Sequence, residues 1–171
     1  MDYISLIFIK SPGIGAFFIR LFTRSRWNHV AIVLNSSEVI EAVGSGVRRR
    51  RMDTLMASRP EHEFVNVEVP NKQAGLDFLL AQVGKPYDYG AIWAFVFLLG
   101  FPALARAATW LWSALGGTPR DWQEDSKWFC CELGESTIVQ AGRNRLSIPV
   151  SRLTPGMEYN LPAQYGPTLK F

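Results

Sequence analysis

The sequence predicts an α+β fold built around a central antiparallel sheet. Segments with the pattern of strands and segments with helical spacing follow one another without regular alternation, which argues against a doubly wound parallel sheet. A short polar turn also joins two strand-like segments directly, as in a β-hairpin. The 171 residues, 48% of them hydrophobic, exclude intrinsic disorder and are enough for one compact domain. We therefore expect a single domain over residues 1–171.

The first part of the chain contains the patterns of three strands and one helix. Ile4–Ile9 is a short apolar run that ends at a Ser-Pro-Gly turn, and Gly15–Thr23 is apolar and predicted to be helical. Asn28–Leu34 alternates and is rich in β-branched residues, so we expect a strand there. The turn Asn35–Ser37 leads into a return strand over Glu38–Val43, and the two strands are predicted to pair as a hairpin.

A run of four arginines, Arg48–Arg51, follows the hairpin. Together with Met52–Arg59 it is predicted to form a solvated connection. The alternative is a site for an anionic partner, such as lipid headgroups, a teichoic-type polymer or nucleic acid. Because the formal net charge is only +3 and no wider basic face accompanies the run, nucleic-acid binding is not expected.

Beyond the arginines, the pattern predicts a strand and a helix. Glu63–Val69 alternates, so that Val65, Val67 and Val69 share one face of a strand. Asn71 is a suitable N-cap for the helix that follows, and Gly84 suits its C-terminal end. The apolar residues at helical spacing within it are Leu76, Leu79, Leu80 and Val83.

The last part of the chain is predicted to contain a helix, a strand and a tail. The helix runs from about Cys130 to Ala141 and is stopped by Gly142. Leu146–Val150 is predicted to be a final strand. The tail from Thr154 is rich in proline and glycine, and we expect it to be extended along the surface.

An apolar insertion covers about residues 89–115. Pro102 divides it, and each half is too short for a membrane span of about 20 residues. We expect a buried or lid-forming helical hairpin. The alternative is a bent or interfacial element, since Trp93, Trp110 and Trp112 suit a boundary between water and lipid. Tyr89–Leu115 is then a candidate contact with a membrane or a virion.

The two cysteines, Cys130 and Cys131, are adjacent, so they cannot form a disulfide without strain. Only two histidines, His29 and His62, accompany them, and no metal site or cofactor is expected. Reduced thiols and the lack of a convincing signal peptide predict a cytoplasmic location, with virion association or peripheral membrane attachment as alternatives.

Cys130 is a candidate nucleophile because it opens a predicted helix. The positive end of the helix dipole favours thiolate over thiol, and the amides there can stabilise an oxyanion. The alternative is that both cysteines are small buried core residues.

His29 is the candidate base, because His62 lies between two glutamates in a segment that is predicted to be exposed. Glu41 is an acid in an otherwise apolar strand. A three-residue loop Asn35–Ser37 places Glu41 opposite Ala31, diagonal to His29 on the same face. A four-residue loop would turn Glu41 to the other face. The predicted site therefore requires the shorter loop.

Four segments together resemble the circularly permuted NlpC-type papain-like cysteine hydrolases, most closely the YiiX-like group, with lecithin:retinol acyltransferase-like proteins as more distant relatives. The segments are Asn28–Ile32, Val39–Ala42, Gly84–Tyr89 and Phe129–Leu133. In that family the histidine strand precedes the cysteine helix, as it does here. The resemblance implies a permuted papain-like fold in which Cys130 is the nucleophile, His29 the general base and Glu41 the group that orients it. Cys131 occupies a position where the family usually has serine.

The resemblance also implies a reaction. A thiol hydrolase of this type cleaves an amide or peptide bond, such as one in bacterial cell-wall peptide, through an acyl-thioester intermediate, in a bacterial or phage protein. The alternatives are a lipid or thioester acyl hydrolase or acyltransferase at a membrane surface, and a non-catalytic virion or assembly protein on the same fold.

Overall fold

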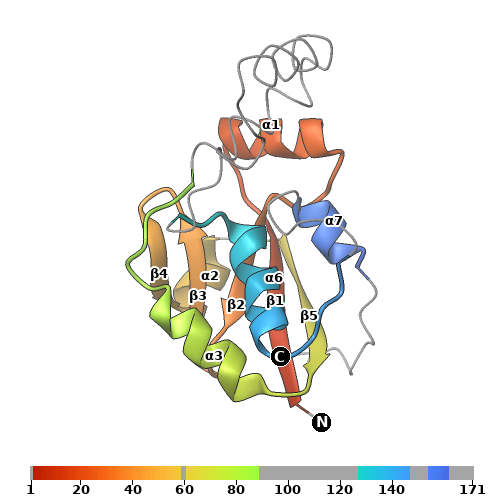
Figure 1. Ribbon diagram of the computed structural model, residues 1–171. Coiled ribbons are helices and arrows are strands. Elements are labelled where there is room, and N and C mark those ends of the chain that lie inside the picture. The colour runs from red at the N-terminus through yellow and green to blue at the C-terminus, as the bar shows by residue number, and fades with distance from the viewer. Residues whose placement is uncertain (1, 59–60, 89–126, 147–153, 162–171) are drawn as a thin grey trace, which may run out of the picture.

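The computed structural model describes residues 2–58, 61–88, 127–146 and 154–161, and contains a five-stranded antiparallel sheet in the order β4-β3-β2-β1-β5 (Figure 1). The strands are β1 (Asp2–Lys10), β2 (His29–Val33), β3 (Glu38–Val43), β4 (Gly46–Arg51) and β5 (Glu61–Val69). The α+β class and the antiparallel sheet predicted from the sequence are therefore confirmed.

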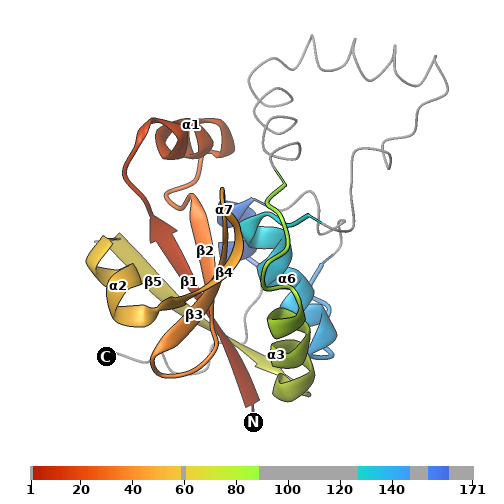
Figure 2. The same cartoon turned by 90° about the vertical axis from the view of Figure 1, so that its left-hand side faces the viewer.

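Helices cover both faces of this sheet and one of its ends. They are α1 (Ile14–Thr23), α2 (Met52–Ser58), α3 (Lys72–Ala81), α6 (Cys130–Gln140) and α7 (Pro155–Tyr159). Helices α3 and α6 lie on one face and α2 on the other (Figure 2). Helix α1 lies beyond the end of the sheet where β1 ends and β2 begins, and the first residue of α6 is at the same end.

Two apolar clusters hold these layers together. The larger cluster joins the sheet to α3 and α6 and includes Leu6, Phe8, Ile32, Leu79 and Leu133. The smaller cluster, on the side of α2, consists of Ile7, Ile9, Ala31, Val39 and Leu55. Strands β1 and β2 contribute to both clusters because successive side chains point to opposite faces. Each fully buried leucine or isoleucine contributes roughly 1.5–3 kcal/mol to folding.

The β2–β3 hairpin has the predicted three-residue loop. The backbone N–H groups of Leu34 and Asn35 both donate to the carbonyl of Glu38. The Asn35 side chain accepts the Ser37 N–H at 2.9 Å, which fixes the turn. Ala31 therefore pairs with Glu41, as predicted from the loop length.

The later elements also largely follow the pattern of the sequence. Val65, Val67 and Val69 are buried on β5, and Asn71 caps α3 by accepting the Ala74 N–H at 3.0 Å. Helix α3 ends at Ala81, however, so Val83 lies beyond it and is exposed. Helix α6 has nearly the predicted bounds, and Gly142, with φ +89°, lies just past its C-cap.

The arginine run corrects the prediction of a solvated loop. Residues 48–51 belong to the edge strand β4, and the residues after them form α2. Arg48 pairs directly with Glu41 across the ladder, and Arg51 with Glu38. Opposite charges on neighbouring strands stabilise this pairing, and charged residues suit a sheet edge because they discourage aggregation.

The tail is a second correction. It is helical over Pro155–Tyr159 instead of extended, with the Thr154 hydroxyl accepting the Met157 N–H at 3.2 Å and proline in the first turn. The apolar insertion Tyr89–Leu115 and the predicted strand after Leu146 lie outside the described residues. Within the described ranges, no helix is both long enough and apolar enough to cross a membrane.

Candidate active site

The predicted histidine and glutamate are hydrogen-bonded to each other. His29 Nε2 lies 2.8 Å from Glu41 Oε2, and both side chains are buried. The other carboxylate oxygen accepts from Arg48 Nη2 at 2.8 Å and from Arg48 Nε at 3.1 Å. Arg50 Nη1 lies 3.5 Å from the same oxygen. Strand β4 thus supplies two guanidinium groups to a carboxylate that orients a histidine.

These contacts shift both pKa values toward an ion pair. Burial alone would raise the pKa of Glu41, but the hydrogen bonds and charges of His29 and Arg48 lower it to about 2. Burial would likewise lower the pKa of His29, whereas hydrogen bonds with Cys130 and Glu41 raise it to about 9. The imidazole is therefore protonated at neutral pH and is held between two negative groups.

Cys130 is the first residue of α6, and its thiol and the His29 imidazole are close enough to shift each other's pKa. Since Glu41 occupies Nε2 of His29, Nδ1 is the nitrogen that remains for the sulfur. Val30 pairs with Phe8 of β1 but precedes the part of β2 that pairs with β3, where the ladder starts at Ala31–Glu41. The backbone N–H of Val30 helps to lower the pKa of the Cys130 thiol.

A parallel bridge between Tyr87 and Trp128 fixes the entry into α6. The Asp88 N–H donates to the Trp128 carbonyl at 3.0 Å, and the Trp128 N–H donates to the Pro86 carbonyl at 3.1 Å. Phe129 then serves as the N-cap without a side-chain hydrogen bond, so no side chain caps the first-turn amides. Through this bridge, the segment that ends at Asp88 lies beside the start of the cysteine helix.

The two adjacent thiols differ in their surroundings. A hydrogen bond from Cys131 is the largest influence on Cys130, and with His29 it holds the pKa of the Cys130 thiol well below its usual range despite burial. Burial, together with the neighbouring Cys130 sulfur, raises the pKa of Cys131 well above its usual range. The sulfur atoms are 3.8 Å apart. Two thiolates this close would repel each other, so Cys130 is the thiol that ionises.

The structure thus brings together all three residues that the sequence predicts for the site: Cys130, His29 and Glu41. His62, predicted to be exposed, is exposed on β5. Sequence reasoning missed Arg48 and Arg50 as partners of Glu41, although their cross-strand positions follow once the β3–β4 register is known. It also missed Glu158, a buried acid in α7 that influences both thiols.

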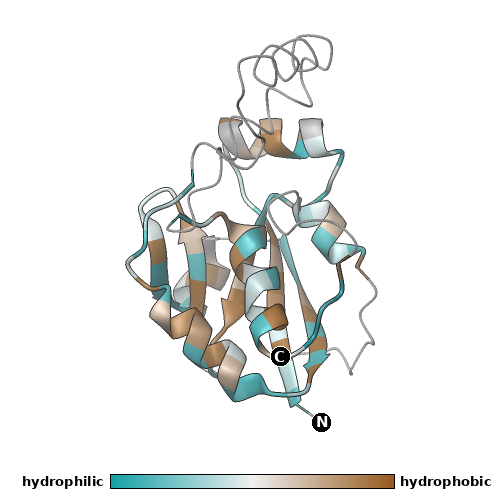
Figure 3. Cartoon of the chain, in the orientation of Figure 1, coloured by the Kyte–Doolittle hydropathy of each residue, from teal (hydrophilic) through white to brown (hydrophobic). Residues whose placement is uncertain are grey.

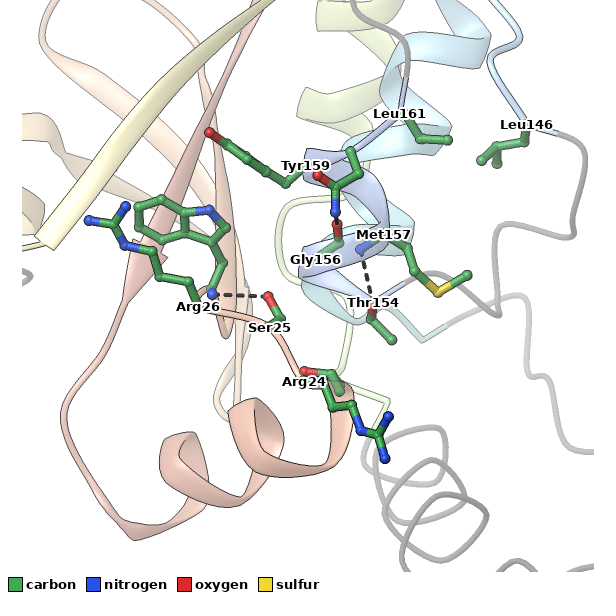
Figure 4. Close-up of a pocket in the computed structure, with 12 residues that line it drawn as sticks. Arg24, Ser25, Arg26, Leu146, Thr154, Gly156, Met157, Tyr159 and Leu161 are labelled. Atoms are coloured by element: carbon green, nitrogen blue, oxygen red, sulfur yellow. Dashed lines mark hydrogen bonds between the residues drawn. The ribbon is translucent and has the colours of Figure 1, made fainter.

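A pocket of about 640 Å³ lies between the α1–β2 connection and α7 (Figure 4). Arg24, Ser25 and Trp27 line it from the α1–β2 connection, and Thr154, Met157 and Tyr159 line it from α7 and its N-cap. Cys130, His29 and Glu41 are not among its described lining residues. The described lining therefore does not include the thiol, although Trp27 precedes His29 by only two residues in the sequence.

Within the part of the chain that the structure describes, no cluster of three or more histidine, cysteine or acidic side chains could hold a metal ion. No protein-family model matches the sequence, and no curated protein matches it.

Proposed function

We propose that the protein is a cysteine hydrolase that cleaves an amide or peptide bond through an acyl-thioester intermediate, on a permuted papain-like fold. The observation that carries the proposal is the continuous chain of contacts from Arg48 through Glu41 and His29 to Cys130. The pKa values of His29 and Cys130 are shifted in the directions that favour an imidazolium–thiolate pair. Bacterial cell-wall peptide is the substrate class that the sequence resemblance implies.

In the first half-reaction, the Cys130 thiolate attacks the carbonyl carbon, a C–S bond forms, and the carbonyl π electrons move to oxygen. The Cys130 backbone N–H at the start of α6 is one donor for this oxyanion. The intermediate then collapses and the C–N bond breaks. His29 gives its Nδ1 proton to the leaving amine, so the proton is already in place before the substrate binds.

In the second half-reaction, neutral His29 removes a proton from water, and the resulting hydroxide attacks the thioester carbonyl. The C–S bond breaks, the acid product leaves, and Cys130 returns to thiolate while His29 is again protonated. Glu41 touches neither substrate nor sulfur, and acts by holding the Nε2–H tautomer and stabilising the positive charge. Arg48 and Arg50 in turn keep Glu41 ionised.

Thiol reactivity tests this proposal. We would follow iodoacetamide alkylation across pH, locate the label by mass spectrometry, and compare the wild type with His29→Ala. His62→Ala is the matched control because His62 is exposed and outside the site. Fast labelling of Cys130 near neutral pH, slowed at least tenfold in His29→Ala alone, supports the imidazolium–thiolate pair. Slow labelling of both thiols that neither substitution changes contradicts it and favours a non-catalytic assembly role.

A lipid or thioester acyl substrate at a membrane surface is the second candidate, and one observation favours it. Helix α1 lies at the same end of the sheet as the start of α6 (Figure 1), and Figure 3 shows apolar stretches along it. Its large apolar side chains are exposed. The exposed fractions are 79% for Ile14, 53% for Phe17, 44% for Phe18 and 55% for Leu21. Such a face suits insertion into the boundary of a bilayer.

Parallel assays separate the two candidates. Purified protein is incubated with muropeptides and with phospholipid vesicles, and Ile14→Ser/Leu21→Ser is compared with the wild type. Loss of vesicle binding and of lipid hydrolysis in the double variant, without hydrolysis of muropeptides by either protein, favours the lipid substrate. Hydrolysis of muropeptides that is unchanged in the double variant favours the peptide substrate.

A further inference from the structure

Glu158 lies buried against the helix that carries the nucleophile. Glu158 is 1% exposed and belongs to α7, which packs on α6. A Cβ atom at Gly134 of α6 would lie 2.6 Å from Glu158 Oε1. Only glycine at position 134 therefore leaves room for this carboxyl group on the helix surface. The contact places the acid one turn from Cys131, on the side of the helix that the core covers.

The carboxyl group of Glu158 has no strong donor to support a negative charge. Neither oxygen makes a hydrogen bond of good geometry within the described residues. The buried cation nearby, Arg145, already binds Glu135 through Nη2 at 2.5 Å and Nε at 3.3 Å. Burial and the charge of Glu135 raise the pKa of Glu158 well above its usual range. These surroundings therefore favour the neutral carboxylic acid of Glu158 over the carboxylate.

Cys131 connects this acid to the nucleophile. Cys131 is 0% exposed, and its sulfur lies 3.8 Å from the Cys130 sulfur. Glu158 contributes to raising the pKa of the Cys131 thiol. Cys130 is the thiol that ionises, and a second thiolate beside it would be repelled. Cys131 therefore keeps its thiol proton.

We infer that Cys131 is a positioning residue for the nucleophile: its S–H donates to the sulfur of Cys130, and Glu158, buried without a donor to its carboxyl group among the described residues, puts no negative charge beside Cys131 to compete for that proton. The inference rests on the proposed function in taking Cys130 as the nucleophile. It assigns a role to a residue pair that the mechanism above does not use. His29 and Cys131 then both stabilise the thiolate of Cys130.

The pKa of Cys130 tests the inference without a substrate. Cys131→Ala removes the donor and Cys131→Ser keeps one, and each variant has a single thiol, so the ultraviolet absorbance of the thiolate reports Cys130 alone. We expect Cys131→Ala to raise the pKa of Cys130 by about one unit, which is about tenfold less thiolate below that pKa. Cys131→Ser should restore the lower value. Equal pKa values in the two variants would overturn the role of Cys131.

Glu158→Gln tests the acid. The amide is neutral, like the protonated acid, so the lower of the two thiol pKa values should stay within about 0.3 unit of the wild type. An ionised Glu158 would repel the thiolate, and its replacement would then lower that pKa by more, which contradicts the inference. Failure of His29→Ala to change the Cys130 pKa would instead count against the proposed function. The two proposals therefore fail by different variants.

Discussion

Glu41 and Glu158 are two buried carboxyl groups of the candidate site and its surroundings, and their pKa values are shifted in opposite directions. Glu41 has a pKa of about 2, while the pKa of Glu158 is raised well above the ordinary value. Both residues are at most 1% exposed, so burial does not distinguish them. The difference lies in the donors: Glu41 has His29, Arg48 and Arg50, whereas the cation near Glu158 is taken by Glu135. The hydrogen-bond donors and cations around each carboxyl group, and not its burial, therefore decide which of the two acids is charged.

The comparison predicts that the charged acid matters most for activity. Glu41→Gln should lower kcat/KM by about 10²- to 10⁴-fold, because the histidine loses the charge that fixes its tautomer. The alkaline limb of the kcat/KM profile, expected near the His29 pKa of about 9, should also move to lower pH. Glu38→Gln on the same strand is the matched control, since Glu38 pairs with Arg49 away from the site. Equal kcat/KM values for Glu41→Gln and Glu38→Gln would contradict the comparison.

Stability should depend on pH with opposite signs at the two acids. Glu41 has a folded pKa below its unfolded value of about 4.5, so its stabilisation is present above that pH and is lost as pH falls toward 2. The full contribution is about 3 kcal/mol. Glu158 has a raised folded pKa, so its effect reverses: stability falls as pH rises above its unfolded value.

Urea titrations at a series of pH values measure both effects. Relative to the wild type, Glu41→Gln should be most destabilised above pH 4.5 and approach the wild type in acid. Glu158→Gln should improve steadily relative to the wild type as pH rises from acid to neutral. Parallel curves for the two variants would show that the acids have similar ionisation.

Disturbing the packing of Glu158 against α6 should have a smaller effect on the free energy of unfolding. Gly134→Ala should destabilise the fold by about 1 kcal/mol, because the end of the Glu158 side chain, 2.6 Å from the new methyl group, must shift. In a Glu158→Ala background the same change should be neutral or stabilising, since alanine is the better helix former. A double-mutant cycle from thermal denaturation measures this coupling, and strict additivity would contradict the packing described.

Replacing an arginine of β4 should have the smallest effect on stability. Arg48→Ala should cost about 1 kcal/mol or less, because the Arg48 side chain is 45% exposed and Arg50 still faces Glu41. It should nevertheless raise the pKa of Glu41, whereas Arg49→Ala should not. Titration of the carboxyl groups by NMR separates the two variants.

The part of the site that depends on local pattern could be predicted from the sequence. The loop length between two strands sets which residues face each other, so the Ala31–Glu41 register and the diagonal position of His29 follow from Asn35–Ser37. The bounds of the helix that begins at Cys130 could also be predicted from the sequence, since Gly142 marks its end. These features involve residues close together in the chain.

The rest depends on contacts that sequence patterns do not show. The arginines of β4 have no apolar alternation, and their strand forms because acids on β3 face them. Helix α7 is short, and its buried Glu158 is recognisable only through the space that Gly134 leaves on another helix. A charged residue in a polar tail is ordinarily exposed, so its burial could not be inferred.

The bridge between Tyr87 and Trp128 has a consequence for how such a protein can diverge. It joins the chain on both sides of residues 89–126, two residues before the nucleophile, so the residues that flank this stretch lie side by side. Closing a longer loop between fixed ends adds only about 0.6 kcal/mol for each doubling of its length. Recombination could therefore exchange this stretch for one of another length or composition, and so alter substrate choice, while the reacting groups keep their alignment.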